Sequence, residues 1–286
     1  MDQAVDFQAI PRVAAGRARG GRETQQDDVV CLHDAQEEAF LLVLADGMGG
    51  DGAGELASDG VVAVARRLWD AGQWREQPGP LFLESLCQEA HAELHRRRAG
   101  LESGEPHSTV VAMMVHGGRV SWAHVGDSRL YRFQGGQLLG RTEDHSLAQL
   151  RLLQGEITEG ELATHPDQHK LLRGLGGPEA PLVEHGCAVL RAGQSYVLCS
   201  DGVWEQLSTE ELARFARRRD QAQALREALA LAVERGGLEG DNVALIFARP
   251  ARDGWWRRYG DRLRWALRRA APGRRRLATT YNEASS

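Results

Sequence analysis

The sequence predicts an α+β layered sandwich, and three patterns support this fold class. Seven short runs rich in β-branched and apolar residues are bounded by Gly, Asp or Ser, as buried strands usually are. Three longer stretches repeat apolar residues at helical spacing. Successive strands in the middle of the chain are joined by turns too short for a crossover, which favours antiparallel sheets over a doubly wound parallel sheet.

Seven runs of the sequence have the composition of strands. They lie at 29–32, 40–45, 109–115, 119–125, 129–133, 195–199 and 243–248. Gly117-Gly118 and Gly135-Gly136 follow two of these runs at positions typical of hairpin turns. We therefore expect the middle of the chain to form an antiparallel meander.

Helical spacing appears in three stretches that frame the strands, at 55–69, 81–98 and 221–235. The first stretch places its apolar residues on one face, namely Leu56, Val61, Val64, Ala65 and Leu68. An apolar face of this kind predicts a helix that packs against a sheet. We expect one helix pair after the Asp46 loop and another helix near the end of the folded domain.

Composition sets milder limits. The chain has 286 residues with 42% apolar content, enough to bury a substantial core in one or two domains. Its four cysteines show no Cys-x-x-Cys spacing, and three lie among apolar neighbours, so we expect buried free thiols and a reducing compartment, the cytoplasm. We expect neither a signal peptide nor a membrane span, because no apolar run approaches roughly 20 residues.

The charge of the chain is unevenly distributed. Residues 251–286 hold ten arginines against three carboxylates, a net charge of +7. Because the whole chain has a net charge of −5, residues 1–250 carry a net charge of −12. We predict a catalytic domain at 1–250 and a basic amphipathic tail at 251–286, partly disordered. The tail pattern is compatible with an anionic membrane surface, a partner protein or the acidic body of the chain itself.

Five aspartates stand at turn-like points, each next to glycine or asparagine or at the mouth of an apolar run. They are Asp27, Asp46, Asp127, Asp201 and Asp241. Carboxylates at the ends of buried strands repel one another and are costly to desolvate unless cations hold them. The pattern therefore predicts a cluster of hard divalent metals and a metal-dependent hydrolase.

Six segments occur in one order and carry a family resemblance. They are Arg22 to Asp28, Asp46-Gly47-Met48-Gly49-Gly50 with Gly54 to Ser58, Ala123 to Arg129, Asp144-His145-Ser146-Leu147, Ser200-Asp201-Gly202 and Asp241-Asn242. From about residue 12 to 249 the chain resembles the metal-dependent protein serine/threonine phosphatases of the protein phosphatase 2C type, in their short bacterial form. The resemblance implies a four-layer sandwich of two antiparallel β-sheets flanked by α-helices.

The resemblance also implies an activity and a metal set. The reaction would be hydrolysis of phosphoserine and phosphothreonine in proteins by a water that two Mn²⁺ or Mg²⁺ ions activate. Asp46 would bridge both ions and the Gly47 carbonyl would ligate one of them. Asp201 and Asp241 would hold the other ion, with Asp27 contributing directly or through a water.

Three further roles follow from the same resemblance. A third, weaker ion would be held partly by Asp127 with help from Asp201. Arg22 would grip the substrate phosphate, a task that its planar guanidinium suits. Residues 152–177 would form a flap that shapes access for phosphoprotein substrates. The implied partners are phosphoproteins and a cognate Ser/Thr kinase, and we expect no nucleic-acid partner.

The sequence departs from the family pattern at two positions near the metals, and the first of them, Gln26, keeps a second hypothesis open. Gln26 stands where many members have glutamate, which removes one charge near the metals, and Met48 stands where eukaryotic members have a histidine. A catalytically impaired module that binds phosphoproteins is the alternative function. The retained aspartates weigh against it, because an inactive protein has no reason to keep mutually repelling carboxylates together.

Three polar residues have simpler interpretations. Ser128 is not accompanied by the partners of a nucleophile, so we expect a hydroxyl that caps a turn. His124 and His145 lie at strand or loop edges, where a histidine is more often hydrogen-bonded than catalytic. We leave all three outside the predicted catalytic set.

Overall fold

Two antiparallel β-sheets form the centre of the fold in the computed structural model, which describes residues 6–250. The first sheet has the order β1 (Asp6–Ile10), β2 (Val13–Ala18), β12 (Val243–Ala248), β11 (Gln194–Cys199), β8 (Arg129–Gln134) and β9 (Gln137–Arg141). The second has the order β10 (Glu184–Val189), β7 (Arg119–Val125), β6 (Val110–His116), β4 (Ala39–Met48) and β3 (Asp27–Asp34), and β5 (His107–Ser108) pairs with β4.

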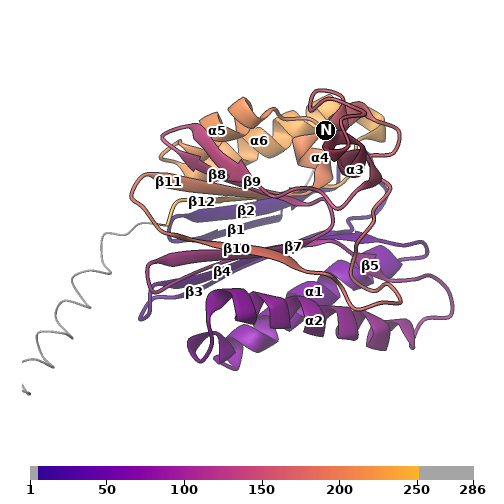
Figure 1. Ribbon diagram of the computed structural model, residues 1–286, viewed down its shortest axis with the longest axis horizontal. Helices are drawn as coiled ribbons and strands as arrows, with labels where there is room; N and C mark the ends of the chain where they lie inside the picture. Colours follow the sequence, from indigo (N-terminus) through magenta and orange to yellow (C-terminus); the bar gives the residue numbers. More distant parts are fainter. Residues whose placement is uncertain (1–5, 251–286) are drawn as a thin grey trace, which may run out of the picture. The chain divides into compact units, whose positions relative to one another are not determined.

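Helices cover the outer face of each sheet, so the four-layer α+β sandwich is confirmed (Figure 1). The second sheet carries α1 (Ala53–Asp70) and α2 (Gly79–Arg98), with η1 (Gln73–Arg75) between them. The first sheet carries α4 (Asp201–Trp204), α5 (Thr209–Ala216) and α6 (Gln221–Gly236). The remaining helical turns are α3 (Leu147–Leu153), η2 (Leu162–Thr164) and η3 (Gly237–Glu239).

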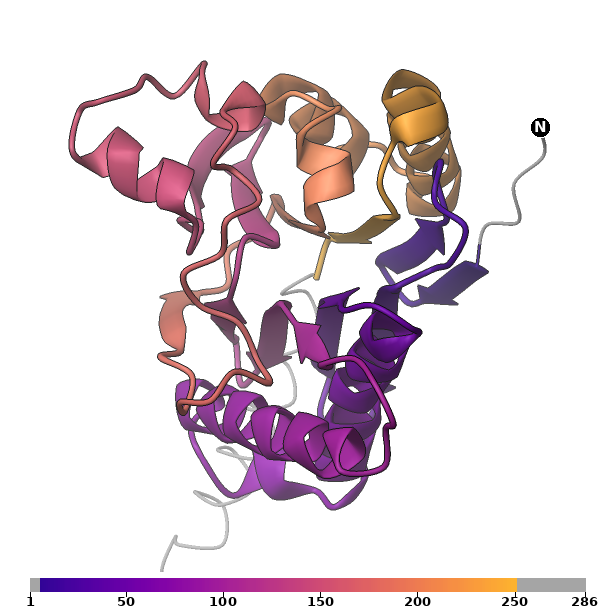
Figure 2. The same cartoon turned by 90° about the vertical axis from the view of Figure 1, so that its right-hand side faces the viewer.

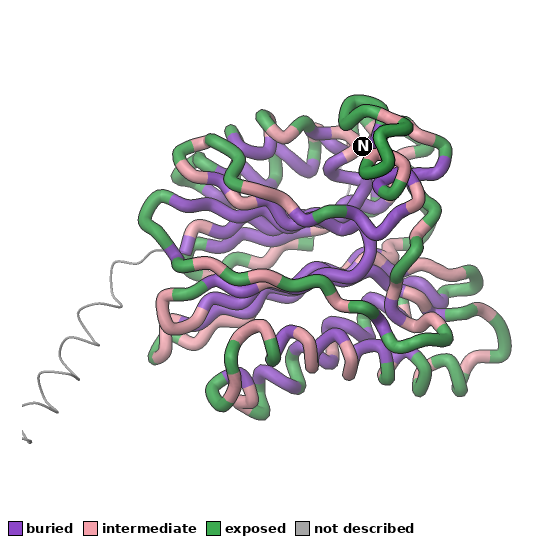
Figure 3. Tube along the Cα trace, viewed as in Figure 1, coloured by how far each residue is buried: buried purple, intermediate pink, exposed green. Residues whose placement is uncertain are grey.

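The layers bury three apolar clusters, one between the sheets and one under each helix layer (Figure 3). Strand β4 contributes to two of them, because Leu41 and Val43 face the helices while Leu42 and Leu44 face the other sheet. The sequence of a strand buried on both faces is a continuous apolar run, without the alternation of apolar and polar residues seen in half-buried strands. This explains why residues 40–45 are all apolar, and it makes Asp46 the first acidic residue of a strand with no solvated face.

The expected meander is wrong in its middle. Gly117-Gly118 does turn β6 into β7, and Gly135-Gly136 does turn β8 into β9, but these two hairpins belong to different sheets. Between Val125 and Arg129 the chain passes from the second sheet to the first. Gly126 makes this passage with φ 109°, where an added Cβ would lie 2.6 Å from the Thr109 side chain. Two short strands joined by three residues can pair with each other or change sheets, and the apolar pattern is the same for both.

Other expectations are settled by the fold. The seven predicted strands and three predicted helices are present, and β1, β2, β5, β9 and β10 are additional. None of the four cysteines forms a disulfide, and all but Cys187 are buried, as predicted. Within residues 6–250, no helix combines the length and the apolar character needed to cross a bilayer. The predicted tail at 251–286 lies outside the described residues.

Candidate metal centre

Backbone pairing brings the predicted aspartates to one end of the sandwich. Helices α3 and α4 and strand β5 lie on the right-hand side of Figure 1, the side that faces the viewer in Figure 2. Asp27 opens β3 directly opposite Asp46 near the end of β4. In the other sheet, Asp201 follows β11 and Asp241 precedes β12, and these two strands are neighbours. Asp127 lies in the passage between the sheets. Five carboxylates from both sheets therefore converge.

Electrostatics show how close this convergence is. Burial raises the pKa of the Asp46 carboxyl well above its usual value, and the charges of Asp27, Asp201, Asp127 and Asp241 raise it further. Burial, followed by the charges of Asp201 and Asp241, likewise raises the pKa of Asp27 against the opposing effect of its hydrogen bond. Carboxylates that raise each other's pKa in this way are held together at a cost that a bound cation would remove.

The Asp46 carboxylate is the least compensated member of the cluster. Its backbone is fixed, because the Asp46 carbonyl accepts hydrogen bonds from the Thr109 amide at 2.8 Å and from Ser108 Oγ at 3.0 Å. Among residues 6–250, no hydrogen bond or ion pair reaches its side-chain oxygens. Asp46 is half-buried. A carboxylate that is partly removed from water, lies among other carboxylates and has no partner is unfavourable unless a cation neutralises it, so the donor set fits a hard divalent cation.

Short local hydrogen bonds orient the other carboxylates. Asp201 accepts from the Gly202 amide at 2.6 Å, and Asp241 accepts from the Asn242 amide at 2.7 Å, each through Oδ1. Asp27 Oδ2 accepts from Ser200 Oγ at 2.7 Å. Each carboxylate thus has one oxygen fixed by its neighbour. The second oxygen of Asp241 accepts from Arg22 at 2.7 Å, and that of Asp201 lies 3.6 Å from His169 Nδ1.

Gly47 is required by packing. An added Cβ would lie 2.0 Å from the Gly54 carbonyl oxygen, so no other residue fits without a shift of the backbone. The Gly47 amide donates to the Gln26 carbonyl at 3.0 Å. This contact joins the end of β4 to the segment before β3.

Arg22 lies at the rim of the cluster. Its guanidinium donates to Asp241 Oδ2 at 2.7 Å, and 57% of its side chain is exposed. A half-exposed arginine beside the carboxylates can receive an incoming anion and is held in place meanwhile by Asp241. The position agrees with the predicted phosphate-binding role without testing it.

Gln26 supplies hydrogen bonds in place of charge. Its side-chain amide donates to the Gly49 carbonyl at 3.3 Å, and its backbone amide donates to Asn242 Oδ1 at 2.7 Å. Asn242 in turn donates to the carbonyls of Arg19 and Thr24. Asn242, which follows Asp241, therefore fixes the whole segment that precedes Asp27. The sequence motif indicated this residue but not its task.

The sequence reasoning missed two residues beside Asp201. His169 and Glu205 each offer a ligand atom, and together with one from Asp201 these atoms lie within 4.8 Å of one another. Burial and the charge of Asp201 raise the pKa of Glu205 to about 7, and the Asp201 carboxylate, 3.6 Å from His169 Nδ1, raises the pKa of His169 to about 9. The spacing of Glu205 four residues after Asp201 on one helical turn was the available signal.

The residues left outside the catalytic set are hydrogen-bonded, as expected. Ser128 Oγ lies 2.8 Å from Thr109 Oγ1 in the passage between the sheets. His124 Nε2 lies 2.8 Å from the Glu143 carbonyl, and His145 Nδ1 accepts from the Gly126 amide at 3.1 Å. These contacts brace the turn that carries Asp127.

Comparison with known proteins identifies the family. The sequence model of the family described as protein phosphatase 2C matches residues 15–232 of this chain. The chain is 34% identical over 245 residues to the serine/threonine protein phosphatase PstP of Mycobacterium tuberculosis, which covers 84% of this chain and 45% of that protein. It is 31% identical over 202 residues to the serine/threonine phosphatase stp of Listeria monocytogenes, covering 68% and 78% of the two chains.

A solved structure agrees with these sequence relatives. The catalytic domain of PstP in complex with two manganese ions superposes with a TM-score of 0.70 at 29% identity, over 86% of this chain and 99% of that one. The chain spans about half the length of the mycobacterial relative that it matches. The fold, the motifs and the family match agree, and the chain belongs to the protein phosphatase 2C family.

Proposed function

We propose that this protein removes phosphate from serine and threonine side chains of other proteins in a reaction that depends on Mn²⁺ or Mg²⁺. The observation that carries the proposal is the convergence of five aspartates from two sheets around an Asp46 carboxylate without a partner. The names of the PstP and stp relatives, and the two manganese ions bound to the PstP catalytic domain, support the same activity.

Each residue at the centre has a proposed task. Asp46 and the Gly47 carbonyl would hold one ion, Asp46 with Asp201 and Asp241 the other, and Asp27 would complete the set. Such a pair of cations supplies an attacking water of lowered pKa and offsets the charge on the phosphoryl oxygens. The protein's own contribution is to hold the carboxylates in place through Ser200, Gly202 and Asn242.

Four finer assignments belong to the same proposal. Asp127 would hold a third and weaker ion together with Asp201. Burial and the charge of Asp201 raise the pKa of the Asp127 carboxyl. Arg22 would release Asp241 to bind the substrate phosphate. The opposing kinase would be a bacterial Ser/Thr kinase, and the three buried free thiols favour a reducing cytoplasm.

Residues 152–177 are proposed to shape access for the substrate. The C-terminal part of the segment is anchored beside the centre. The Leu172 amide donates to the His145 carbonyl at 2.7 Å, and Leu175 exchanges two backbone hydrogen bonds with Ser108 next to Asp46. His169 within the segment lies beside Asp201. A loop tied at these points can select the phosphoprotein that reaches the cluster.

The test is hydrolysis of an aryl phosphate and of a phosphothreonine peptide with and without millimolar Mn²⁺. Asp46→Asn removes a bridging charge, and we expect kcat to fall by about 10²-fold or more. Asp34→Asn is the matched control, because Asp34 closes the opposite end of β3 and pairs with Arg75, and its activity should equal that of the wild type. Peptide binding without Mn²⁺-dependent turnover would instead support the impaired binding module that Gln26 suggests.

A further inference from the structure

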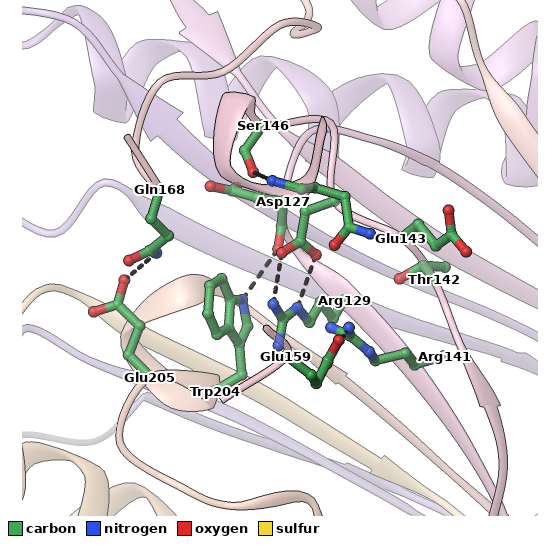
Figure 4. Close-up of polar contacts among 12 residues, drawn as sticks. Asp127, Arg129, Arg141, Thr142, Glu143, Ser146, Glu159, Gln168, Trp204 and Glu205 are labelled. Atoms are coloured by element: carbon green, nitrogen blue, oxygen red, sulfur yellow. Dashed lines mark hydrogen bonds and ion pairs between the residues drawn. The ribbon is translucent and has the colours of Figure 1, made fainter. Parts of the chain in front are cut away.

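A buried arginine, Arg129, lies against the ring of Trp204 (Figure 4), and each of its side-chain nitrogens has a hydrogen-bond partner. Arg129 is 6% exposed. Its Nε and Nη2 donate to the two oxygens of Asp144 at 2.7 and 2.5 Å, and its Nη1 donates to the Tyr131 hydroxyl at 3.1 Å. The guanidinium also lies 3.4 Å from the centre of the Trp204 ring. A fork-like ion pair combined with stacking fixes both the arginine and the indole.

The indole fixed by Arg129 joins two predicted metal ligands. Trp204 ends α4, the helical turn that begins at Asp201. Its Nε1 donates to the backbone carbonyl of Asp127 at 3.0 Å (Figure 4). One side chain therefore connects the element that carries Asp201 to the turn that carries Asp127. Because the ring is held against Arg129, it cannot rotate away and release that carbonyl.

The other side of the same turn is braced as well. The His145 amide donates to the Gly126 carbonyl at 3.0 Å, while the Gly126 amide donates to His145 Nδ1 at 3.1 Å. His145 directly follows Asp144, so the partner of Arg129 and the brace of Gly126 belong to one segment. The backbone around Asp127 is thus held from both sides, and its carboxylate remains available to a cation.

Asp144 also decides where the positive charge of Arg129 acts. Arg129 lies near enough to Asp127 for its charge to lower the pKa of that carboxyl. An arginine released from Asp144 would be free to turn toward Asp127 and compete with a cation there. Holding the guanidinium on Asp144 and over Trp204 prevents this competition.

We propose that Arg129, Asp144 and Trp204 are positioning residues that fix Asp127 relative to Asp201 and so set the affinity of the weakest-bound divalent cation. The proposal rests on the proposed function, because it concerns the same carboxylates. The three residues touch neither substrate nor cation. They act through the Asp127 backbone.

Trp204→Phe isolates the proposed contact, because phenylalanine keeps an aromatic face for Arg129 and loses the N–H that reaches Asp127. The loss of one such hydrogen bond predicts a Mn²⁺ affinity about 3- to 10-fold weaker for the weakest ion. Isothermal titration with MnCl₂ measures it on the full chain, at a temperature where circular dichroism shows each variant folded. The kcat for an aryl phosphate should return toward the wild-type value at saturating Mn²⁺, which a general loss of structure would not allow.

The matched control is Trp122→Phe. Trp122 also lies under an arginine, with Arg132 4.5 Å from its ring centre, but it is on β7 away from Asp127. Its Mn²⁺ titration should match the wild type. Arg129→Lys keeps the positive charge but loses the paired hydrogen bonds to Asp144, so it should weaken the binding of the same Mn²⁺ ion. Combining it with Trp204→Phe should weaken binding less than the two single effects together, because both act along one path.

The outcomes separate the two proposals. Wild-type protein that binds no Mn²⁺ would overturn the proposed function and the positioning role together. Wild-type protein that binds Mn²⁺, with Trp204→Phe binding it equally well, would overturn the positioning role alone. If Trp204→Phe does not fold, the Arg129→Lys titration decides in the same way, and an unchanged weakest ion would again reject the role.

Discussion

At the scale of single residues, the aspartates of this protein depend on small neighbours. Gly202 and Asn242 follow Asp201 and Asp241, and their amides fix one carboxylate oxygen each. Asp-Gly and Asp-Asn are common in ordinary turns, where the side chain bonds to the backbone just ahead. The same local chemistry therefore serves a turn and a metal site, and only convergence with other carboxylates distinguishes them.

Gly47→Ala is expected to destabilise the protein, because the added Cβ would lie 2.0 Å from the Gly54 carbonyl. Forced overpacking of this kind costs about 1–3 kcal/mol. Gly50→Ala is the control, since nothing lies within 4 Å of a Cβ at that position. Urea unfolding of both variants measures the free energy. Equal midpoints for the two would show that the loop after β4 adapts freely.

At the scale of elements, helix α5 shows how a short segment is defined by its ends. Ser208 and Glu211 form a complete capping box, in which each side chain bonds to the backbone amide of the other residue. Arg235 from α6 donates to both Glu211 oxygens at 2.7 and 2.8 Å. One carboxylate thus caps α5 and ties it to α6. This helix was missed in the sequence because its apolar face is only a few residues long.

Glu211 predicts a pH dependence of stability. Hydrogen bonds from Arg235 and from the Ser208 amide lower the pKa of Glu211 to about 2 from its ordinary value of 4.5. A lowered folded-state pKa gives stabilisation that is fully present above pH 4.5 and is lost as the pH falls toward about 2. Wild-type protein should therefore lose more unfolding free energy than Glu211→Gln between these pH values.

The comparison is made by urea unfolding at several pH values. Glu210→Gln is the control, because the neighbouring Glu210 is exposed on the same helix and is not part of the capping box. Its stability should follow the wild-type curve. Parallel curves for wild type and Glu211→Gln would contradict the assignment.

At the scale of the whole molecule, the sheets matter because they bring distant residues to one end. Asp27 and Asp46 come from one sheet, and Asp201 and Asp241 flank neighbouring strands of the other. The three-residue passage at Gly126 connects the sheets at the same end and carries Asp127. The strand packing that buries the core thus also assembles the carboxylate cluster.

We expect a chain that ends at residue 250 to fold and to keep Mn²⁺-dependent aryl phosphate hydrolysis. The reason is that β12 ends at Ala248 with pairing partners on both sides, in β11 and β2, so the described sheets need nothing beyond it. Circular dichroism and the aryl phosphate assay measure fold and activity. A shortened chain that is unfolded, or folded but inactive, would show that residues 251–286 belong to the catalytic unit.

Much of the fold could be predicted from local pattern. Continuous apolar runs identified β4 and β6, because strands buried on both faces admit few polar residues. Strands β9 and β10 escaped prediction, since both are edge strands with polar or exposed side chains. The candidate site was anticipated where a motif is local, as at Asp46-Gly47. His169, Glu205 and Trp204 were missed because their importance depends on which distant residue they touch.

The sequence by itself determined seven of the strands, the principal helices and the five acidic positions, because apolar periodicity and Asp-Gly chemistry act over a few residues. Tertiary structure alone decided that Gly126 changes sheets, that the five carboxylates meet, and that Arg129 turns to Asp144 and not to Asp127. The physical reason is the separation along the chain over which each effect acts. Conformational preference is set by neighbours along the chain, whereas burial and electrostatic interaction are set by whatever packing brings near.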